Sequence, residues 1–184
     1  MLFEPPKAVW RIIMIKKSIK RILSSFLAIT LVLTLVISLP ATASAQSGSL
    51  KVPASGKKMS IALKVGRTGD SSTVTFRVSG LPTNAIITKL QVNPGSLSSY
   101  SGAMRTNYLT ITSSSGRSEQ ITWLGAAGKT LTTSKFLASK ANGTYTISFN
   151  CTCSGGAFVN GVLTDIGTKT YSNPYIELWW DDTL

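Results

Sequence analysis

The chain has 184 residues and a net charge of +12, from 19 Lys and Arg against 7 Asp and Glu, and it contains no histidine. Without imidazole groups, histidine-dependent hydrolases and histidine-based zinc sites are excluded, so we expect no enzymatic activity, no cofactor and no metal. The basic surplus favours an anionic partner, but the basic residues are scattered and form no nucleic-acid motif, so no nucleic acid is expected.

Residues 1–45 have the three parts of a secretory signal peptide. A basic region ends at Arg21, an apolar run of 14 residues spans Phe26 to Leu39, and Pro40 precedes the small residues Ala43-Ser44-Ala45. The apolar run is shorter than the ~20 residues that cross a bilayer, which favours cleavage over a retained anchor. We predict a secreted or loosely wall-associated product with no stable membrane insertion after processing.

The first thirteen residues fit this signal poorly, because Glu4 and two prolines precede a basic region that is already complete. Met14 opens a more ordinary signal, so we predict that translation starts there. Residues 46–56 are expected to be a short linker and 57–184 a single domain. The 13 Lys and Arg and 6 Asp and Glu after the predicted cleavage site leave that product a net charge of +7.

Apolar residues alternate with polar ones along most of the domain, which predicts strands. The segments 59–66 and 72–80 are expected to pair as a hairpin around the turn "RTGD", and they place the following residues inward: Met59, Ile61, Leu63, Val74, Phe76 and Val78. The next strand, 85–93, aligns Ile86, Leu90 and Val92, and residues 93–107 are expected to form a long loop.

The second half of the chain continues this pattern. Two strands, 107–116 and 119–125, are expected to flank a tight turn at "SSSGRS", and 134–143 is the one segment where a short helical turn is expected, with Phe136 and Leu137 over the core. Strands are expected at 144–153, 157–167 and 173–180. About eight strands with one buried face each predict an all-β fold, an antiparallel β-sandwich or jelly roll.

Both cysteines lie in "TYTISFNCTC", two residues apart on one predicted strand face. An exported pair usually forms a disulfide, and we expect Cys151 and Cys153 to form a short, strained one. Alternate residues of a regular strand are about 6.6–6.8 Å apart at Cα, the upper limit for a disulfide, so a bulge would be needed. Two buried free thiols, or metal or redox chemistry, are the alternatives.

Aromatic side chains suggest a binding face. Tyr175 and Trp179 flank Glu177 on the outward side of the last strand, and Tyr108 is outward on its own strand. Rings of this kind stack on sugars while a carboxylate accepts hydrogen bonds from hydroxyl groups. The other interpretation is that a further layer covers these residues and makes them part of the core.

We therefore expect a secreted, non-catalytic β-sandwich that binds at or outside the bacterial cell surface, to a polysaccharide or an anionic wall polymer. The alternative is an assembly subunit or adhesin that self-associates through an edge strand, with the C-terminal "PYIELWW" as the candidate edge. A small enzyme is the third possibility, for which Glu177 is the most interesting carboxylate.

Overall fold

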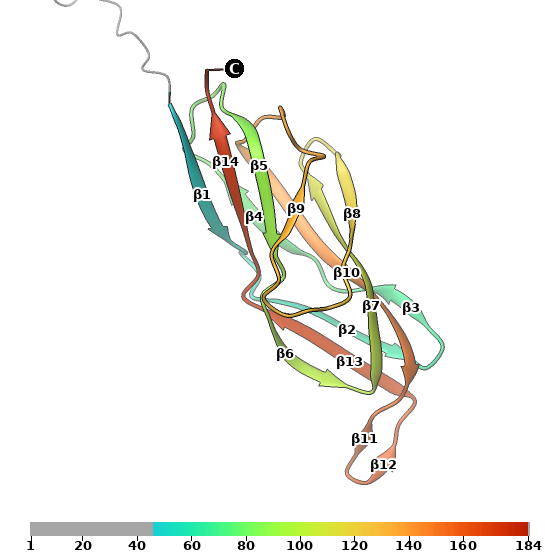
Figure 1. Cartoon of the computed structure of the whole chain (residues 1–184). Coiled ribbons are helices and arrows are strands. Elements are labelled where there is room, and N and C mark those ends of the chain that lie inside the picture. The colour runs from blue at the N-terminus through green and yellow to red at the C-terminus, as the bar shows by residue number, and fades with distance from the viewer. Residues whose placement is uncertain (1–45, 184) are drawn as a thin grey trace, which may run out of the picture. The chain divides into compact units, whose positions relative to one another are not determined.

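A computed structural model describes residues 46–183 as an all-β domain with antiparallel pairing throughout, which confirms the predicted fold class (Figure 1). The predicted signal peptide and the Met14 start lie outside the described residues. The strands are β1 (Ser47–Pro53), β2 (Lys58–Lys64), β3 (Thr68–Asp70), β4 (Val74–Val78), β5 (Ile86–Asn93), β6 (Ser96–Ser101), β7 (Ala103–Ser113), β8 (Ser118–Thr122), β9 (Leu131–Thr133), β10 (Gly143–Gly155), β11 (Phe158–Val159), β12 (Val162–Leu163), β13 (Ile166–Ser172) and β14 (Tyr175–Asp181). No helix among these residues is long and apolar enough to cross a membrane.

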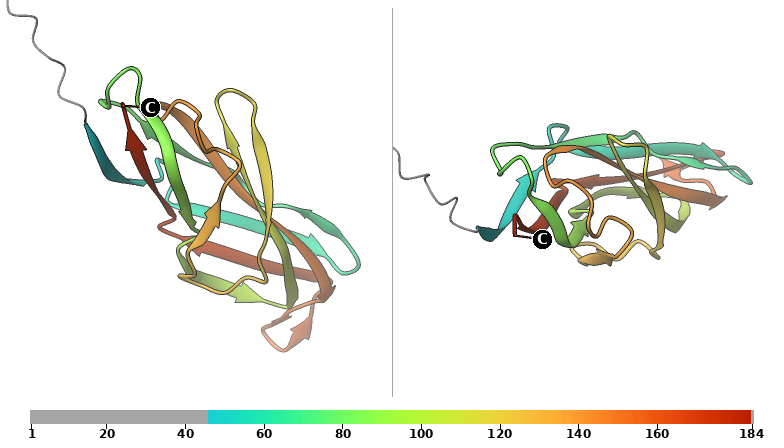
Figure 2. Two further views of the ribbon diagram at one scale, coloured as in Figure 1. Left: turned by 45° about the horizontal axis from the view of Figure 1, so that its top comes forward. Right: turned by 90° about the horizontal axis from the view of Figure 1, so that it is seen from above.

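One layer consists of two sheets that share three chain segments. The first sheet has the order β1-β14-β5-β9, and the second has the order β2-β13-β6. Because β1 runs into β2, β5 into β6 and β13 into β14, the same three segments lie side by side in both sheets (Figures 1 and 2). The two sheets therefore form a three-stranded ribbon that bends once, with β9 added at one edge.

The bend coincides with a proline in each of the three segments, namely Pro53, Pro94 and Pro174. Proline has no backbone N–H to donate to a ladder, so pairing is interrupted there. Two backbone hydrogen bonds reconnect the outer segment to the central one, from Ala54 N to Pro174 O at 3.1 Å and from Asn173 N to Lys57 O at 2.8 Å.

The other layer is a five-stranded sheet built around β10. Strand β10 pairs with β3 and β4 along one edge and with β7 along the other, and β7 pairs with β8. The predicted alternation in β10 is confirmed, since Tyr145, Ile147, Phe149 and both cysteines are buried. This alternation stays unbroken because β7 carries the extra residue, Asn107, where the register shifts. Because these five residues on one face are all buried, β10 lies at the centre of the core.

A single apolar core joins the two layers. At its centre Trp123 lies 4.8 Å from Tyr171 and 6.2 Å from Phe149 between ring centroids. Buried rings of this size dominate the energetics of a core, and edge-on pairs add about 0.5–1.5 kcal/mol beyond their buried area. Phe149 lies in β10, Tyr171 lies in β13 and Trp123 directly follows β8, so these rings tie together segments that are distant in sequence.

Four predictions about local structure are wrong. The segment 46–56, predicted as a linker, contains β1, which pairs with β14 from Ser47↔Asp181 to Pro53↔Tyr175. Strands β2 and β4 do not form a hairpin with each other, because the chain crosses between layers after β2, which pairs with β13. The predicted loop 93–107 forms β6 and the start of β7. The segment 134–143 forms turns and a bridge rather than a helical turn, with Phe136 buried but Leu137 43% exposed.

The inward face of β5 also differs from the prediction. Ile87, rather than Ile86, is buried together with Leu90 and Val92. The register between β5 and β14 shifts between Trp179 and Trp180, leaving Thr88 as the extra residue. An extra residue reverses the alternation beyond it, so a strict period of two assigns the wrong isoleucine to the core.

Gly95 offers a test of the bend. Its φ is +84°, and an added Cβ would lie 2.0 Å from the Ser172 carbonyl oxygen of the neighbouring segment. We expect Gly95→Ala to lower the free energy of unfolding by about 2–4 kcal/mol, because it adds a clash to an unfavourable backbone conformation. Urea denaturation measures the effect.

Gly116→Ala is the matched control, since Gly116 also has a positive φ of +79° but an added Cβ would meet no atom within 4 Å. Its cost should be about 1 kcal/mol. Equal losses in the two variants would show that the close approach at the bend does not matter.

Candidate functional site: a lysine–aromatic face on the outer sheet

The outer face of the first sheet brings together three of the predicted site residues. Tyr175, Glu177 and Trp179 are half-buried on one side of β14, while Ile176 and Leu178 on the other side are in the core. Tyr108 does not join them. It lies on β7, opposite Asn150, in the other layer of the sandwich. Three of the four predicted residues therefore share one face, and Tyr108 lies apart from them.

Two lysines that sequence reasoning missed complete this face. Lys51 of β1 carries its Nζ 3.8 Å from the ring centroid of Tyr175, and Lys89 of β5 carries its Nζ 4.2 Å from the ring of Trp179. Cation–π pairs of this kind contribute about 0.5–1 kcal/mol each at exposed sites. The lysines come from the strands on either side of β14, so only the pairing register reveals them.

Glu177 lies between these two pairs, opposite Lys51 on one side and Gln91 on the other. It forms no ion pair in the part of the chain that the structure describes, where the only salt bridge joins Lys64 and Asp165 at 3.9 Å. The Lys51 ammonium lies over the ring of Tyr175. The Glu177 carboxylate therefore remains available to accept a hydrogen bond from a ligand.

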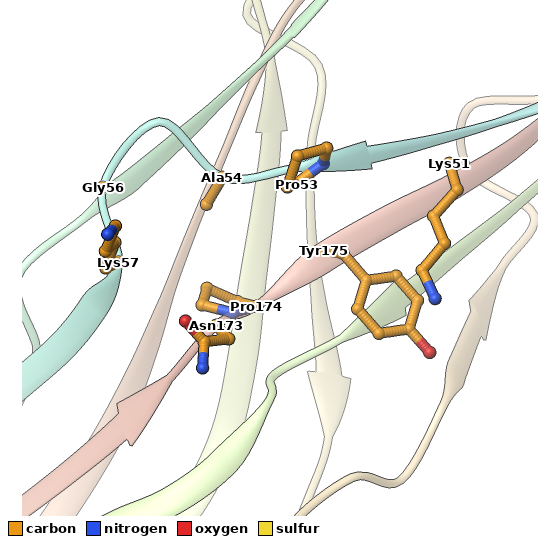
Figure 3. A pocket seen from close by; sticks show the side chains of 8 residues that line it. All are labelled: Lys51, Pro53, Ala54, Gly56, Lys57, Asn173, Pro174 and Tyr175. Atoms are coloured by element: carbon orange, nitrogen blue, oxygen red, sulfur yellow. The ribbon is translucent and has the colours of Figure 1, made fainter.

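A hollow adjoins the Tyr175 end of this face, at the bend of the ribbon. Its volume is about 430 Å³, and its lining residues are Lys51, Pro53, Ala54, Gly56, Lys57, Asn173, Pro174 and Tyr175. Figure 3 shows the Lys51 side chain beside the ring of Tyr175, with Pro53 on one chain segment and Pro174 on the neighbouring segment. The lining includes two ammonium groups and no carboxylate. A cationic, partly apolar concavity of this kind suits an anionic group on a ring or polyol.

A second hollow lies at the other end, beside Trp179. Its volume is about 480 Å³, and it is lined by Ser47, Gly48, Ser49, Thr88, Trp179, Trp180 and Asp181. Hydroxyl groups and one carboxylate line it, and lysine does not. We call the surface formed by Lys51, Lys57, Lys89, Tyr175, Glu177 and Trp179 the lysine–aromatic face. It runs along β14 with a hollow at each end.

The predicted disulfide is contradicted, because Cys151 and Cys153 are both free and fully buried. Strand β10 keeps its register from Cys151 to Cys153, between one shift at Asn107 of β7 and a second shift at Ser154 of β10. Their side chains therefore stay parallel at the spacing of alternate strand residues, which is too wide for easy bonding. Cys151 Sγ lies 3.5 Å from Thr106 Oγ1, and the Cys153 thiol donates to Gly155 O at 3.4 Å. This arrangement corresponds to the second of the three interpretations, two buried thiols.

A buried lysine accompanies these thiols. Lys169 points from β13 into the core, where its ammonium donates to Thr106 Oγ1 at 2.8 Å and to Met104 O at 3.4 Å. Burial lowers the pKa of Lys169, and burial raises the pKa of the Cys151 thiol despite the nearby hydroxyl and ammonium. A thiol with a raised pKa is a poor nucleophile. Burial therefore keeps the Cys151 thiol protonated among its buried neighbours.

The carboxylates are dispersed over the domain. Asp70 accepts a hydrogen bond from Asn150 at 2.8 Å, Glu119 accepts one from Thr133, and Asp181 accepts one from the Thr183 hydroxyl at 2.6 Å. Within residues 46–183, no three acid, cysteine or histidine side chains gather at one point. The carboxylates with these local partners act as structural acceptors, whereas Glu177 faces solvent beside two aromatic rings.

No protein-family model matches the chain, and no curated protein matches its sequence. The chemistry of the lysine–aromatic face must therefore be inferred from its own residues.

The free thiols lead to a direct test. Because both are fully buried, we expect neither to react with Ellman's reagent in the folded protein, and both to react after unfolding in urea without a reductant. Absorbance at the thionitrobenzoate band counts the thiols. No reaction in urea would show that the two cysteines form a disulfide after all.

The buried hydroxyl of Tyr171 makes the free energy of unfolding depend on pH in the alkaline range. Its hydroxyl donates to Gly125 O at 2.6 Å, and burial raises its pKa from 10.0 to about 12. The unfolded chain therefore loses this proton first, so the stabilisation is complete below about pH 10 and is lost as the pH rises toward 12. We expect a loss of about 1 kcal/mol by about pH 11 from this group, measured by urea denaturation. Tyr171→Phe should give a shallower pH dependence, and an unchanged slope would contradict the assignment.

Proposed function

We propose that this protein is a secreted, non-catalytic binding protein that holds an anionic polymer of the bacterial surface on its lysine–aromatic face. The observation that carries the proposal is the hollow at the bend, which contains Lys51, Lys57 and the Tyr175 ring but no acid. Anionic groups are bound where ammonium donors converge on a concave, partly apolar surface. Export follows from the predicted signal peptide.

The positions of the lysines favour an anionic ligand over a neutral glycan. A pyranose that stacks on Tyr175 or Trp179 needs a ring face, and Lys51 and Lys89 each cover one at 3.8 and 4.2 Å. The same contacts hold the two ammonium groups in place, which lowers the entropy that they lose when an anion binds. The rings therefore act chiefly as supports for positive charge.

The spacing of the two pairs favours a polymer over a small anion. Tyr175 and Trp179 are four residues apart on one strand, about 13 Å at the usual rise. An extended chain with repeated anionic groups can reach both lysines at once, which raises its effective concentration at the second contact.

Glu177, between the two pairs, accepts hydrogen bonds from hydroxyl groups and repels a further anion. A chain that alternates phosphate or carboxylate with hydroxyl groups fits this pattern, as an acidic polysaccharide or a polyol-phosphate wall polymer does.

The assembly alternative retains one supporting observation. Strand β14 is not an available edge, since it lies between β1 and β5, so the C-terminal segment cannot pair with another chain as that hypothesis requires. Strand β6 is an edge of its sheet, however, and it carries exposed Leu97 and Tyr100 without any charged residue. Uncharged edges of this kind invite pairing between chains.

Retention on immobilised glycerol-phosphate polymer tests the proposal. We expect the double variant Lys51→Gln/Lys57→Gln to bind about tenfold more weakly, because each lost ammonium removes a charge-assisted hydrogen bond. Retention of the wild type should also fall at high salt. A neutral N-acetylglucosamine oligomer should be bound weakly by both proteins.

The matched control is Lys135→Gln/Lys140→Gln, which removes the same charge from two exposed positions that line neither hollow of the face. Equal weakening by the two double variants would show that net charge alone accounts for binding. Stronger retention on the neutral oligomer, lost in Trp179→Ala, would favour sugar stacking instead. Analytical ultracentrifugation without polymer tests the assembly alternative, which predicts species larger than a monomer.

A further inference from the structure

The hairpin of β11 and β12 carries exposed apolar side chains at one end of the domain. Its four strand residues are 52–75% exposed: Phe158, Val159, Val162 and Leu163. Asn160 and Gly161 turn the chain between them, both with positive φ, as a two-residue hairpin turn requires. Figure 1 shows the hairpin projecting beyond the two layers, at the end of the domain away from the C-terminus.

Both faces of this hairpin are apolar. Phe158 pairs with Leu163, and Val159 pairs with Val162. Side chains of successive strand residues point to opposite faces, so each face carries one of these apolar pairs. A protein partner docked on one face would leave the other pair in water. A surrounding medium that accepts apolar groups from all sides would bury both.

The base of the hairpin extends the apolar surface and adds positive charge. Val65 is 46% exposed and Ile166 is 41% exposed, and the Val65 N–H donates to the carbonyl of Asp165 at 2.8 Å, next to Ile166. Lys64 and Arg67 flank Val65 in the same turn and are exposed. Asp165 is the acid at this base, at 3.9 Å from Lys64, so Arg67 stays uncompensated by an ion pair within the described domain.

We propose that the β11–β12 hairpin inserts reversibly into the interfacial region of an anionic lipid bilayer. A short hairpin with two residues in each strand reaches about 7–10 Å, which matches the 5–10 Å depth of interfacial insertion. At that depth lipid carbonyl and phosphate oxygens accept hydrogen bonds from Asn160 at the turn. Lys64 and Arg67 then lie at the level of the anionic headgroups, which attract basic residues.

The two ends of the described domain lie away from the hairpin, so they do not obstruct its contact with a bilayer. Residues 46 and 182 lie together, with Asp182 N donating to Gln46 O at 3.0 Å, at the other end of the domain from the hairpin. The lysine–aromatic face lies on β14 and its neighbours, so neither surface covers the other. The proposal does not depend on the polymer-binding function.

A fluorescent probe on the hairpin tests the proposal in the full chain. Asn160→Cys is labelled with nitrobenzoxadiazole in a Cys151→Ala/Cys153→Ala background, whose folding is checked by urea denaturation. We expect a blue shift and a several-fold rise in emission with phosphatidylcholine vesicles that contain about one third phosphatidylglycerol. The change should be smaller with pure phosphatidylcholine or in about 0.5 M NaCl.

Matched variants separate the hairpin from any other lipid contact of the chain. Adding Phe158→Ser and Leu163→Ser to the labelled protein should raise the vesicle concentration for half-maximal emission about tenfold, because two apolar contacts are lost. Leu124→Ser changes an equally exposed side chain, 74% against 75% for Phe158, and should have no effect. A probe at Ser115, in the turn between β7 and β8, should not respond.

Three outcomes would overturn the proposal. The Asn160 probe could stay unchanged with anionic vesicles, or the Ser115 probe could respond equally. Emission from the Asn160 probe could instead rise with protein concentration in the absence of lipid, which would assign the hairpin to contacts between copies of the chain.

Discussion

The central segment formed by β13 and β14 is paired on both sides along almost its whole length, and it changes direction once, at Asn173-Pro174. The flanking segments, β1–β2 and β5–β6, must bend with it, because a segment that continued straight would lose its backbone hydrogen bonds to either β13 or β14. The prolines end the ladder at that point, and Gly95 permits the close approach to Ser172. This shared bend divides the layer into its two sheets. It also sets the hollow beside Tyr175 and the position of Lys51.

The core of the domain contains a buried lysine that has no acidic partner within residues 46–183. Lys169 enters the core without a carboxylate partner, and its ammonium bonds to a hydroxyl and a carbonyl instead. Desolvation lowers its pKa, and the same burial raises the pKa of the neighbouring Cys151 and Tyr171. Each group is pushed toward its neutral form, which limits the cost of burying them together.

The two proposed contact surfaces differ in chemistry because they differ in their supporting structure. The lysine–aromatic face lies on a broad sheet, where rows of side chains from β1, β14 and β5 hold charges at fixed distances. The hairpin is an isolated pair of strands with two residues each, too small to have a buried face of its own. Its apolar residues therefore remain exposed, and they need another medium to cover them.

Much of the strand pattern is predictable from the sequence. The burial of alternate residues in β2, β4, β10 and β14 follows from a period of two, and so does the outward placement of Tyr175, Glu177 and Trp179. That period fails in β5, where an extra residue at Thr88 moves Ile87 inward. Nothing local reveals such a bulge, because it arises from the register against β14.

The sequence by itself therefore determined the all-β class, the inward side of most strands and the aromatic half of the site, since these depend on local alternation. Only the tertiary structure decided which strands pair, and with them the lysines over the two rings, the separation of Tyr108 and the free state of both thiols. Each of these depends on contacts between segments that are far apart in the chain, and pairing between such segments is set by the packing of the whole domain.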